Sequence, residues 1–402
     1  MKYLRSLTSL FAASVLVLSA PASAQISGDS IKIGLVVDLS SLYADVTGPG
    51  SVEAVKMAIA DMGGAINGKK IEFLFKDYQN KADIAANIAR QWIDQEGVDV
   101  LLASSNSSAA LAMSKIAQEK QKPLLVLSTG TSRLTNEDCN PYTIHFGVDT
   151  TAVARSTGTA IVKRGGKTWY FLTADYAFGI SLEKDTADVV KANGGTVLGS
   201  VKHPIAASDF SSFLLTAQAS KAQILGLANA GADAINAIKA AHEFGINKTM
   251  QLAGMLLFVT DIHSLGLNVT QGMYLTDSWY WDQDNESRTW ARRYFEKIKK
   301  MPNMIHASSY SGVLHYLKAV KATGTDDADK ILAVMKNTPV NDALIKKGTI
   351  RPDGRMVSDL YLRQVKSPAE SKYAWDYYKG GDKIPGDQVF TTKAESRCSY
   401  WK

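Results

Sequence analysis

Cysteine is scarce in this chain of 402 residues, which has two, Cys139 and Cys398, and no C-x-x-C pair. Its six histidines stand singly, never at the spacing at which zinc ligands recur. No G-x-S-x-G elbow occurs, and two stretches that match part of a nucleotide-binding loop have Ile161 and Glu53 where a glycine is required. The sequence therefore predicts no metal, no cofactor and no catalytic residue, and argues against an enzyme.

Long apolar runs are absent after the N-terminus. The apolar run at residues 10–18 follows Lys2 and Arg5, precedes the small residues 22–24, and is shorter than the ~20 residues that a membrane span needs. This is the pattern of an export signal, with cleavage near Ala24. No cysteine follows that position, which argues against a lipid anchor. We expect a mature protein that begins near Gln25 and is soluble in the periplasm.

Charge of one sign is not concentrated anywhere. The formal net charge of +6 falls to +4 without Lys2 and Arg5, and the remaining basic residues are spread along the chain, so no nucleic-acid partner is expected. The mature chain of about 378 residues exceeds what one hydrophobic core usually serves, which predicts two lobes. In an oxidising compartment two lone cysteines most often pair, which predicts a disulfide between Cys139 and Cys398; two free thiols are the alternative.

What the mature sequence does contain is a regular alternation of apolar runs and helical patterns. Helical periodicity covers residues 84–96, 178–192 and 232–244, and Gly97, Gly194 and Gly245 follow these helices as left-handed caps would. Repeated strand–helix units favour parallel sheets with helices on both faces. The predicted strands are residues 31–37, 70–75, 98–103, 124–127, 168–173, 196–201, 223–228, 251–254 and 273–276.

Two turns rich in hydroxyl groups, residues 104–108 and 128–131, each follow an apolar strand. In an open α/β sheet small ligands bind beyond the carboxyl ends of the strands, where helix N-termini present free N–H groups. Neither turn contains an acid, a base or a metal ligand. The pattern therefore favours binding of an anionic or polar group over catalysis.

Segments spread over nearly the whole mature chain together resemble the branched-chain amino-acid-type periplasmic binding proteins of ABC importers. The resemblance is carried by IKIGLVVDLSSLYADVTGPGSVEAVKMAI (31–59), VDVLLASSNSSAALAMSKIA (98–117), KPLLVLSTGTSRLT (122–135), FLTADYAFG (171–179), HPIAASDFSSFLLTAQ (203–218) and ILGLANAGAD (224–233). It implies a type I α/β fold, with two parallel-sheet lobes joined by three crossovers near Val148, Ser278 and Met356. The N-terminal lobe would comprise residues 25–148 and 278–356, and the C-terminal lobe residues 149–277 and 357–402, after a signal peptide at residues 1–24.

The resemblance also implies a set of ligand-binding residues. Ser107, with Asn106 beside it, matches the serine that takes the ligand carboxylate in that family, although an ordinary helix N-cap is the alternative for Ser107. Thr131 matches a threonine that contacts the same group, and Thr129 a residue that offers backbone groups. Four further residues lie on loops that face the cleft in that family, and each aromatic among them could instead pack in the core: Tyr43, Tyr176, Phe178 and Asn229.

One position departs from the family. Amino-acid binders carry an acidic residue after the strand near Gly254, where it pairs with the ligand ammonium, and this chain has Leu256 in that run. A desolvated ammonium without a counter-charge costs several kcal/mol, so an amino acid would bind poorly unless Asp175 or Asp277 substitutes. The aromatic run 279–281, which includes Tyr280, either lines the pocket or packs between the lobes.

The sequence thus predicts an extracytoplasmic solute-binding protein that closes two lobes on a small carboxylate and delivers it to an ABC-transporter permease. We expect a monomer and an amine-free aromatic, keto or aliphatic acid as ligand. A true branched-chain amino-acid binder, a binding protein that serves a sensor, and an exported α/β hydrolase stay open as alternatives.

Overall fold

The structure, a computed structural model, describes residues 25–402, and the predicted export signal lies outside the described residues. Its larger sheet has the strand order β2-β3-β1-β4-β5-β6, parallel throughout except for β2. We call this sheet and the helices packed on it the first lobe. Its strands are β1 (Ser30–Val37), β2 (Ala65–Ile66), β3 (Lys69–Asp77), β4 (Val100–Ala103), β5 (Leu124–Val126) and β6 (Thr143–His145).

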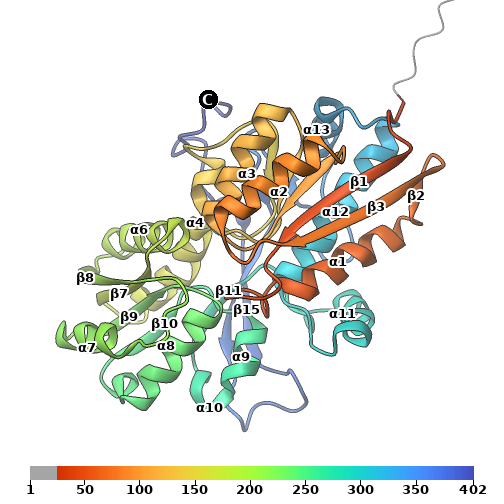
Figure 1. The fold of residues 1–402 in the computed structure, drawn as a ribbon. Coiled ribbons are helices and arrows are strands. Elements are labelled where there is room, and N and C mark those ends of the chain that lie inside the picture. The colour runs from red at the N-terminus through yellow and green to blue at the C-terminus, as the bar shows by residue number, and fades with distance from the viewer. Residues whose placement is uncertain (1–24) are drawn as a thin grey trace, which may run out of the picture.

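Helices cover both faces of this sheet (Figure 1). Side chains alternate across a strand, so Val36 packs with one face while Leu35 and Val37 pack with the other. The Val36 face carries α2 (Ala82–Asp94) and α3 (Ser107–Lys120). The opposite face carries α1 (Gly48–Asp61) and α12 (Met304–Thr323), which lie side by side, with α11 (Asn285–Ile298) and α13 (Ala328–Asn337) against them.

The second lobe is built on a smaller parallel sheet with the order β10-β9-β7-β8. Helix α6 lies on one side of this sheet and helices α7 and α8 on the other (Figure 1). The strands are β7 (Thr168–Ala174), β8 (Thr196–His203), β9 (Ile224–Ala228) and β10 (Gln251–Gly254). The helices are α4 (Thr150–Val153), the π-turn η2 (Ala154–Gly158), α5 (Thr159–Lys163), α6 (Ala177–Ala192), α7 (Ser211–Ala219), α8 (Ala232–Glu243), α9 (Val259–Leu265) and α10 (Leu267–Thr270).

Two further sheets complete the described structure. An antiparallel sheet, β11-β14-β15, includes the strands β11 and β15 that Figure 1 shows near the middle of the molecule. Its strands are β11 (Tyr274–Asp277), β14 (Leu360–Val365) and β15 (Tyr378–Ile384), and a short pair is formed by β12 (Thr349–Ile350) and β13 (Met356–Val357). The remaining short helices are η1 (Ser132–Thr135), η3 (Ile246–Lys248) and α14 (Gly386–Val389).

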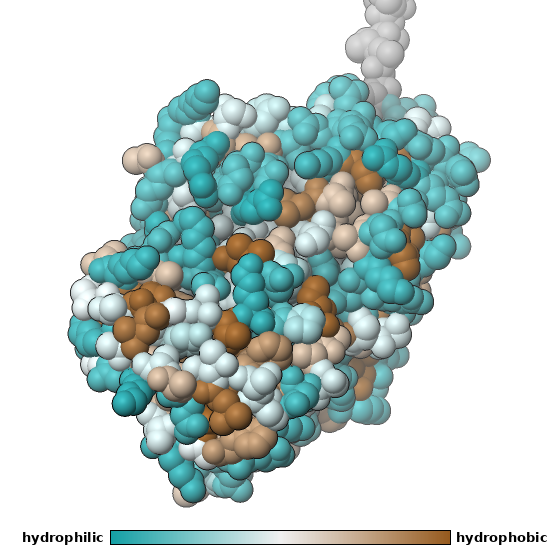
Figure 2. Space-filling view, turned by 60° about the vertical axis from the view of Figure 1, so that its left-hand side comes forward, coloured by the Kyte–Doolittle hydropathy of each residue, from teal (hydrophilic) through white to brown (hydrophobic). Residues whose placement is uncertain are grey.

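The predicted fold class is confirmed, because two parallel sheets carry helices on both faces. Each predicted strand and helix corresponds to an observed one, with ends that differ by up to two residues. Gly97, Gly194 and Gly245 have φ of +65°, +75° and +69°, as left-handed caps require. On the face drawn in Figure 2, hydrophobic side chains form small separate groups among hydrophilic ones. Most of the large hydrophobic side chains of the described residues are buried.

A buried arginine joins the segment that follows β6 to the segment that leads into β13. Arg355, which has no exposed surface, donates from its guanidinium to the carbonyl oxygens of Gly147 and Met356. One guanidinium nitrogen also lies 3.6 Å from a carboxylate oxygen of Asp149, which is equally buried. Burial lowers the pKa of Arg355 to about 10, and it remains a cation at neutral pH.

The predicted disulfide between Cys139 and Cys398 is confirmed. It ties the C-terminal tail to the loop that follows η1, and Arg397 of the tail pairs with Glu137 in the same loop at 2.9 Å. Glu395 of the tail also pairs with Arg155 of the second lobe at 2.8 Å. The tail therefore contacts both lobes near the point at which the chain first leaves β6.

Candidate functional site

A small cavity of about 20 Å³ lies between the two lobes, at the carboxyl ends of β4, β5 and β9, where open α/β sheets bind ligands. The first lobe contributes the residues after β1, β4 and β5 and the start of α12. The second lobe contributes the loops after β7, β9 and β10. The cavity is lined by Tyr43, Val46, Thr47, Ser105, Ser128, Gly130, Tyr176, Phe178, Ala230, Leu256, Phe258 and Ile305.

Hydroxyl groups line the first-lobe side of the cavity. The Oγ1 of Thr47 and the Oγ of Ser105 are 2.8 Å apart, and the Ser105 N–H donates to the Oγ of Ser128 at 2.8 Å. Ser105 has a φ of +75°, a backbone conformation that residues with a Cβ rarely adopt. The chain takes this sharp turn because α3 begins immediately afterwards, where Asn106 accepts a hydrogen bond from the Ala109 N–H at 3.0 Å.

Two tyrosines meet across the cavity, because the hydroxyl of Tyr43 in the first lobe is hydrogen-bonded to that of Tyr176 in the second. Burial raises the pKa of both phenols well above the ordinary value, so both keep their protons at any physiological pH. Two phenolic protons are therefore available, and only one is needed for the bond between them. Within residues 25–402 neither phenol has another hydrogen-bond partner, so the second proton is free to reach an acceptor in the cavity.

The rest of the lining is apolar. The ring of Phe178 packs on Gly130, where a Cβ atom would come within 2.7 Å of a ring carbon. The loop that carries Leu256 and Phe258 is held by Asp261, whose carboxylate accepts from the Phe258 N–H at 3.0 Å. No charged side chain of the described residues lines the cavity. The arrangement offers neutral donors and an apolar wall, which suits an acceptor group on an apolar body.

Four of the residues predicted for the site lie in this lining: Tyr43, Tyr176, Phe178 and Leu256. The other residues predicted from the two turns lie directly behind it. Ser107 accepts from the Thr131 N–H at 3.3 Å, and the Thr131 Oγ1 lies 2.8 Å from the Oγ of Ser181. Thr129 donates nothing from its fully buried hydroxyl within the described chain, and its carbonyl accepts from His145. Asn106 is the N-cap of α3.

Two predicted residues lie elsewhere. Asn229 is buried beside the cavity residue Ala230, and its amide nitrogen lies 3.1 Å from His203 Nε2. The Tyr280 hydroxyl donates to the Trp375 carbonyl at 2.8 Å, and the indole N–H of Trp281 donates to the same oxygen at 3.2 Å. Tyr280 and Trp281 thus pack against the chain near residue 375, while Trp279 donates to Ser287 and packs on Trp290, and none of the three lines the cavity.

Both acids that could have substituted for the missing counter-charge have other partners. Asp175 pairs with Lys202 at 3.0 Å on the surface. Asp277 is buried with Arg363 at 3.5 Å, and burial raises its pKa to about 7 against the opposing charge of Arg363. Neither carboxylate lies in the cavity lining.

Sequence reasoning missed several lining residues. Ser105 and Ser128 lie in the two predicted turns, but which hydroxyl of a turn faces the cavity depends on backbone angles that the pattern did not contain. Thr47 and Ile305 come from the N-terminal ends of two helices of the first lobe, and no sequence signal marked them. Gly130 and Phe258 could have been found as neighbours of predicted site residues.

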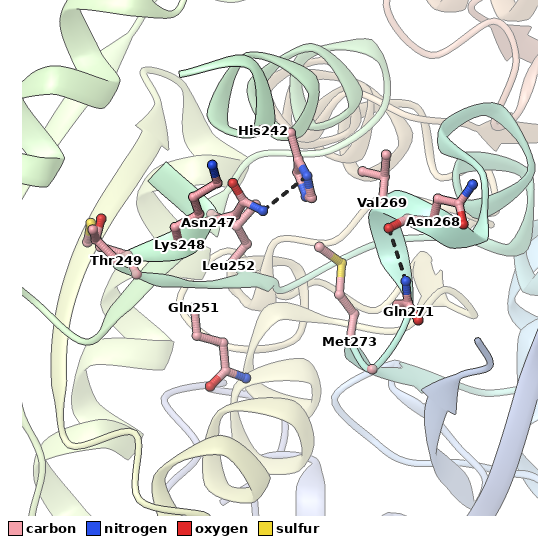
Figure 3. Close-up of a pocket in the computed structure, with 12 residues that line it drawn as sticks. His242, Asn247, Lys248, Thr249, Gln251, Leu252, Asn268, Val269, Gln271 and Met273 are labelled. Atoms are coloured by element: carbon pink, nitrogen blue, oxygen red, sulfur yellow. Dashed lines mark hydrogen bonds between the residues drawn. The ribbon is translucent and has the colours of Figure 1, made fainter. Parts of the chain in front are cut away.

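A second hollow lies at the opposite end of the second-lobe sheet, where β10 begins at Gln251 (Figure 3). It is an open groove of about 510 Å³, lined by neutral polar and apolar side chains and by Lys248. Figure 3 shows two bonds within it: the Asn247 amide lies 3.2 Å from His242, and the Gln271 amide donates to the Asn268 carbonyl at 3.3 Å. Because these groups bond one another at the amino end of the strands, the groove is not the candidate site.

Comparisons with known proteins agree with this geometry. The model of the periplasmic binding protein family matches residues 30–372. A periplasmic binding protein from Burkholderia mallei is 60% identical, covering 93% of this chain and 100% of that chain with a TM-score of 0.92. A branched-chain amino acid ABC transporter periplasmic ligand-binding protein from Burkholderia xenovorans LB400 is 39% identical, with 93% and 100% coverage and a TM-score of 0.82. A solute-binding protein of an ABC transporter from Rhodopseudomonas palustris BisB5, in complex with 3,4-dihydroxybenzoic acid, is 24% identical over 89% of this chain and 98% of that one, with a TM-score of 0.78.

Proposed function

This chain belongs to the periplasmic binding protein family, and from that premise we propose that it captures a small amine-free carboxylate between its two lobes. One observation carries the proposal. The cavity between the lobes offers hydroxyl donors and apolar walls, and no charged side chain among residues 25–402 lines it. Hydrogen bonds from neutral donors to a carboxylate are charge-assisted and strong, whereas an unpaired ammonium in the same place would cost several kcal/mol.

The contacts follow from the lining. The hydroxyls of Ser105 and Ser128 and the free proton of the Tyr43–Tyr176 pair would donate to the carboxylate. Ser107 and Thr131 would act from behind by holding the two turns together, since the Thr131 N–H donates to the Ser107 Oγ. Phe178, Leu256 and Phe258 would enclose the body of the ligand. An aromatic, keto or branched aliphatic acid matches this combination of groups.

Two relatives bear on the ligand class, and they favour different candidates. The protein from Rhodopseudomonas palustris BisB5 shows that this fold accommodates an amine-free aromatic acid. The 39% identical protein from Burkholderia xenovorans LB400 is named for branched-chain amino acids, which favours a true amino-acid binder as the second candidate. The pairing of Asp175 and Asp277 with basic residues weighs against that candidate, because neither carboxylate is available to an ammonium.

Capture would involve closure of the lobes, with the ligand stabilising the closed state because it touches both. The chain would be exported with cleavage near Ala24 and would act as a monomer that presents its ligand to an ABC-transporter permease. We divide the mature chain into residues 25–148 with 278–356 and residues 149–277 with 357–402, joined near Val148, Ser278 and Met356. A protein that reports to a membrane sensor would present the same closed surface.

The experiment is a thermal-shift screen of the mature protein, followed by calorimetric titration, against benzoate, phenylpyruvate, 4-methyl-2-oxopentanoate, leucine and valine. A ligand that binds only the folded state raises the melting temperature by mass action. We expect at least one of the three amine-free acids to bind more tightly than either amino acid. Tight binding of leucine or valine, with no response to the acids, would refute the proposal. Recovery of the ligand unchanged after binding checks that no hydrolysis occurs.

A further inference from the structure

Helix α6 of the second lobe reaches the first lobe outside the cavity. The carboxylate of Asp185, near the middle of α6, accepts a hydrogen bond from the Ser132 hydroxyl at 3.0 Å. Ser132 begins η1, directly after the turn that contributes Ser128 and Gly130 to the cavity. Neither Ser132 nor Asp185 lines the cavity, so this bond crosses between the lobes without involving the ligand.

The same carboxylate oxygen is held in place from its own side. The hydroxyls of Thr150 and Thr151, at the start of α4, donate to it at 2.6 Å and 3.1 Å. The Thr150 Oγ1 in turn accepts from the Ser132 N–H at 3.2 Å, and the Thr150 N–H donates to the Gly130 carbonyl at 2.8 Å. The acceptor for Ser132 is therefore already oriented when the lobes meet, which lowers the entropy lost on forming the bond.

From these contacts we propose that Ser132 and Asp185 form a closure latch, a pair that stabilises the closed state and thereby sets the affinity for every ligand of the cavity. The inference rests on the proposed function, because it assumes that binding and closure are coupled. Asp185 is a positioning residue in this scheme. When the lobes separate, Ser132 and Asp185 exchange their bond for water, and the balance between open and closed states shifts accordingly.

A latch that never touches the ligand has a signature that a ligand contact lacks. Loss of the latch reduces the closed population of the free protein, so the apparent dissociation constants of all ligands rise by one common factor. Loss of a direct contact changes each ligand by a different factor. Because Asp185 is only half-buried and therefore partly solvated, we expect the common factor to be about tenfold.

The experiment compares Ser132→Ala, Asp185→Ala and the double variant with wild type, with benzoate, phenylpyruvate and 4-methyl-2-oxopentanoate as probes. Ser132→Ala removes the hydroxyl bond to Asp185 and leaves in place the bonds from Thr150 and Thr151 to Asp185 and the backbone bonds of Ser132 and Gly130 to Thr150. Asp188→Ala is the matched control, since Asp188 lies one turn further along α6, is exposed, and pairs with Lys184 at 2.8 Å. Calorimetry gives the affinities, and small-angle X-ray scattering reports lobe separation in the free and the ligand-bound protein.

We expect each single variant to weaken the acids that wild type binds by a common factor of about ten, through faster dissociation, while Asp188→Ala keeps the wild-type values. The double variant should be no weaker than the weaker single variant, because both remove the same bond. At the ligand concentration that half-saturates wild type, X-ray scattering of Ser132→Ala should show a larger average lobe separation than that of wild type. Wild-type affinity in Ser132→Ala, or factors that differ between ligands, would overturn the latch. Failure of wild type to bind any of the three acids would instead overturn the proposed function.

Discussion

The tyrosine pair across the cavity gives the sharpest quantitative prediction. In Tyr176→Phe the phenol of Tyr43 loses the only partner that it has in the described chain, while remaining buried in the closed state. In the bound state of this variant the Tyr43 phenol can still donate to the ligand carboxylate, so the closed state loses only the bond between the two phenols, whereas in the open state both phenols can reach water. A neutral hydrogen bond contributes about 0.5–1.5 kcal/mol. We therefore expect the dissociation constant for a bound carboxylate to rise about 2- to 12-fold.

The double variant Tyr43→Phe with Tyr176→Phe separates two roles of the pair. If the phenols bonded only each other, removing both would leave no unpaired group, and affinity would return close to the wild-type value. We expect the double variant to bind more weakly than either single variant, because the donor to the ligand carboxylate is lost as well. Tyr170→Phe is the control, since Tyr170 lies on β7 outside the cavity lining.

Isothermal titration with the tightest acid from the screen, at one temperature and between pH 6 and 8, measures these differences. The raised pKa of both phenols predicts no change in affinity over that pH range from their ionisation. Single variants that bind like wild type, or a double variant that recovers wild-type affinity, would refute the assignment of the pair as a donor to the ligand.

Three further predictions address specificity, pH and the tail. Leu256→Glu places a carboxylate in the cavity lining, and we expect titration to show weaker binding of acids and a gain for leucine; unchanged preference would contradict the counter-charge argument. Burial raises the pKa of Asp261 to about 7, so the folded state holds this proton more tightly than the unfolded chain, and stability should fall as pH rises from about 4 to 7. Urea unfolding of Asp261→Asn should show a shallower fall over that range than wild type, and an equal slope would exclude Asp261 as its source. Replacing Cys139 and Cys398 by serine should lower the free energy of unfolding by about 2–4 kcal/mol, with ligand-induced closure by X-ray scattering retained; loss of closure in a folded variant would show that the tail drives it.

The parts of the fold that the sequence predicted share one property, a local hydrophobic pattern. Strand β10 was predicted with its observed bounds, because a short apolar run bounded by turn residues is typical of a buried strand in an α/β chain. Strand β6 was missed because it is three residues long and includes Thr143 and His145, which give no apolar run. Strand β15 was missed because it is polar and contains Gly380 and Gly381; its place is fixed by pairing with β14.

The candidate site, like the fold, was predicted only where a local sequence pattern marks it. The two hydroxyl-rich turns were predicted from their position after buried strands, and both contribute to the cavity lining. The choice of Ser105 rather than Ser107 as the lining residue follows from the left-handed backbone at Ser105, which a sequence of five polar residues does not specify. The placement of Tyr280 depends on Trp375, almost a hundred residues away in the chain, and no local pattern contains that contact.

The buried guanidinium of Arg355 has a consequence for how the molecule can move. By donating to the Gly147 carbonyl, it joins the segment that follows β6 to the segment at β13 that carries Arg355 itself. If either segment bent independently, the guanidinium of Arg355 would lose its hydrogen bonds and would remain as an unpaired cation in the interior. Relative motion of the lobes should therefore be a rotation about a single hinge axis, with little translation of one lobe along the other.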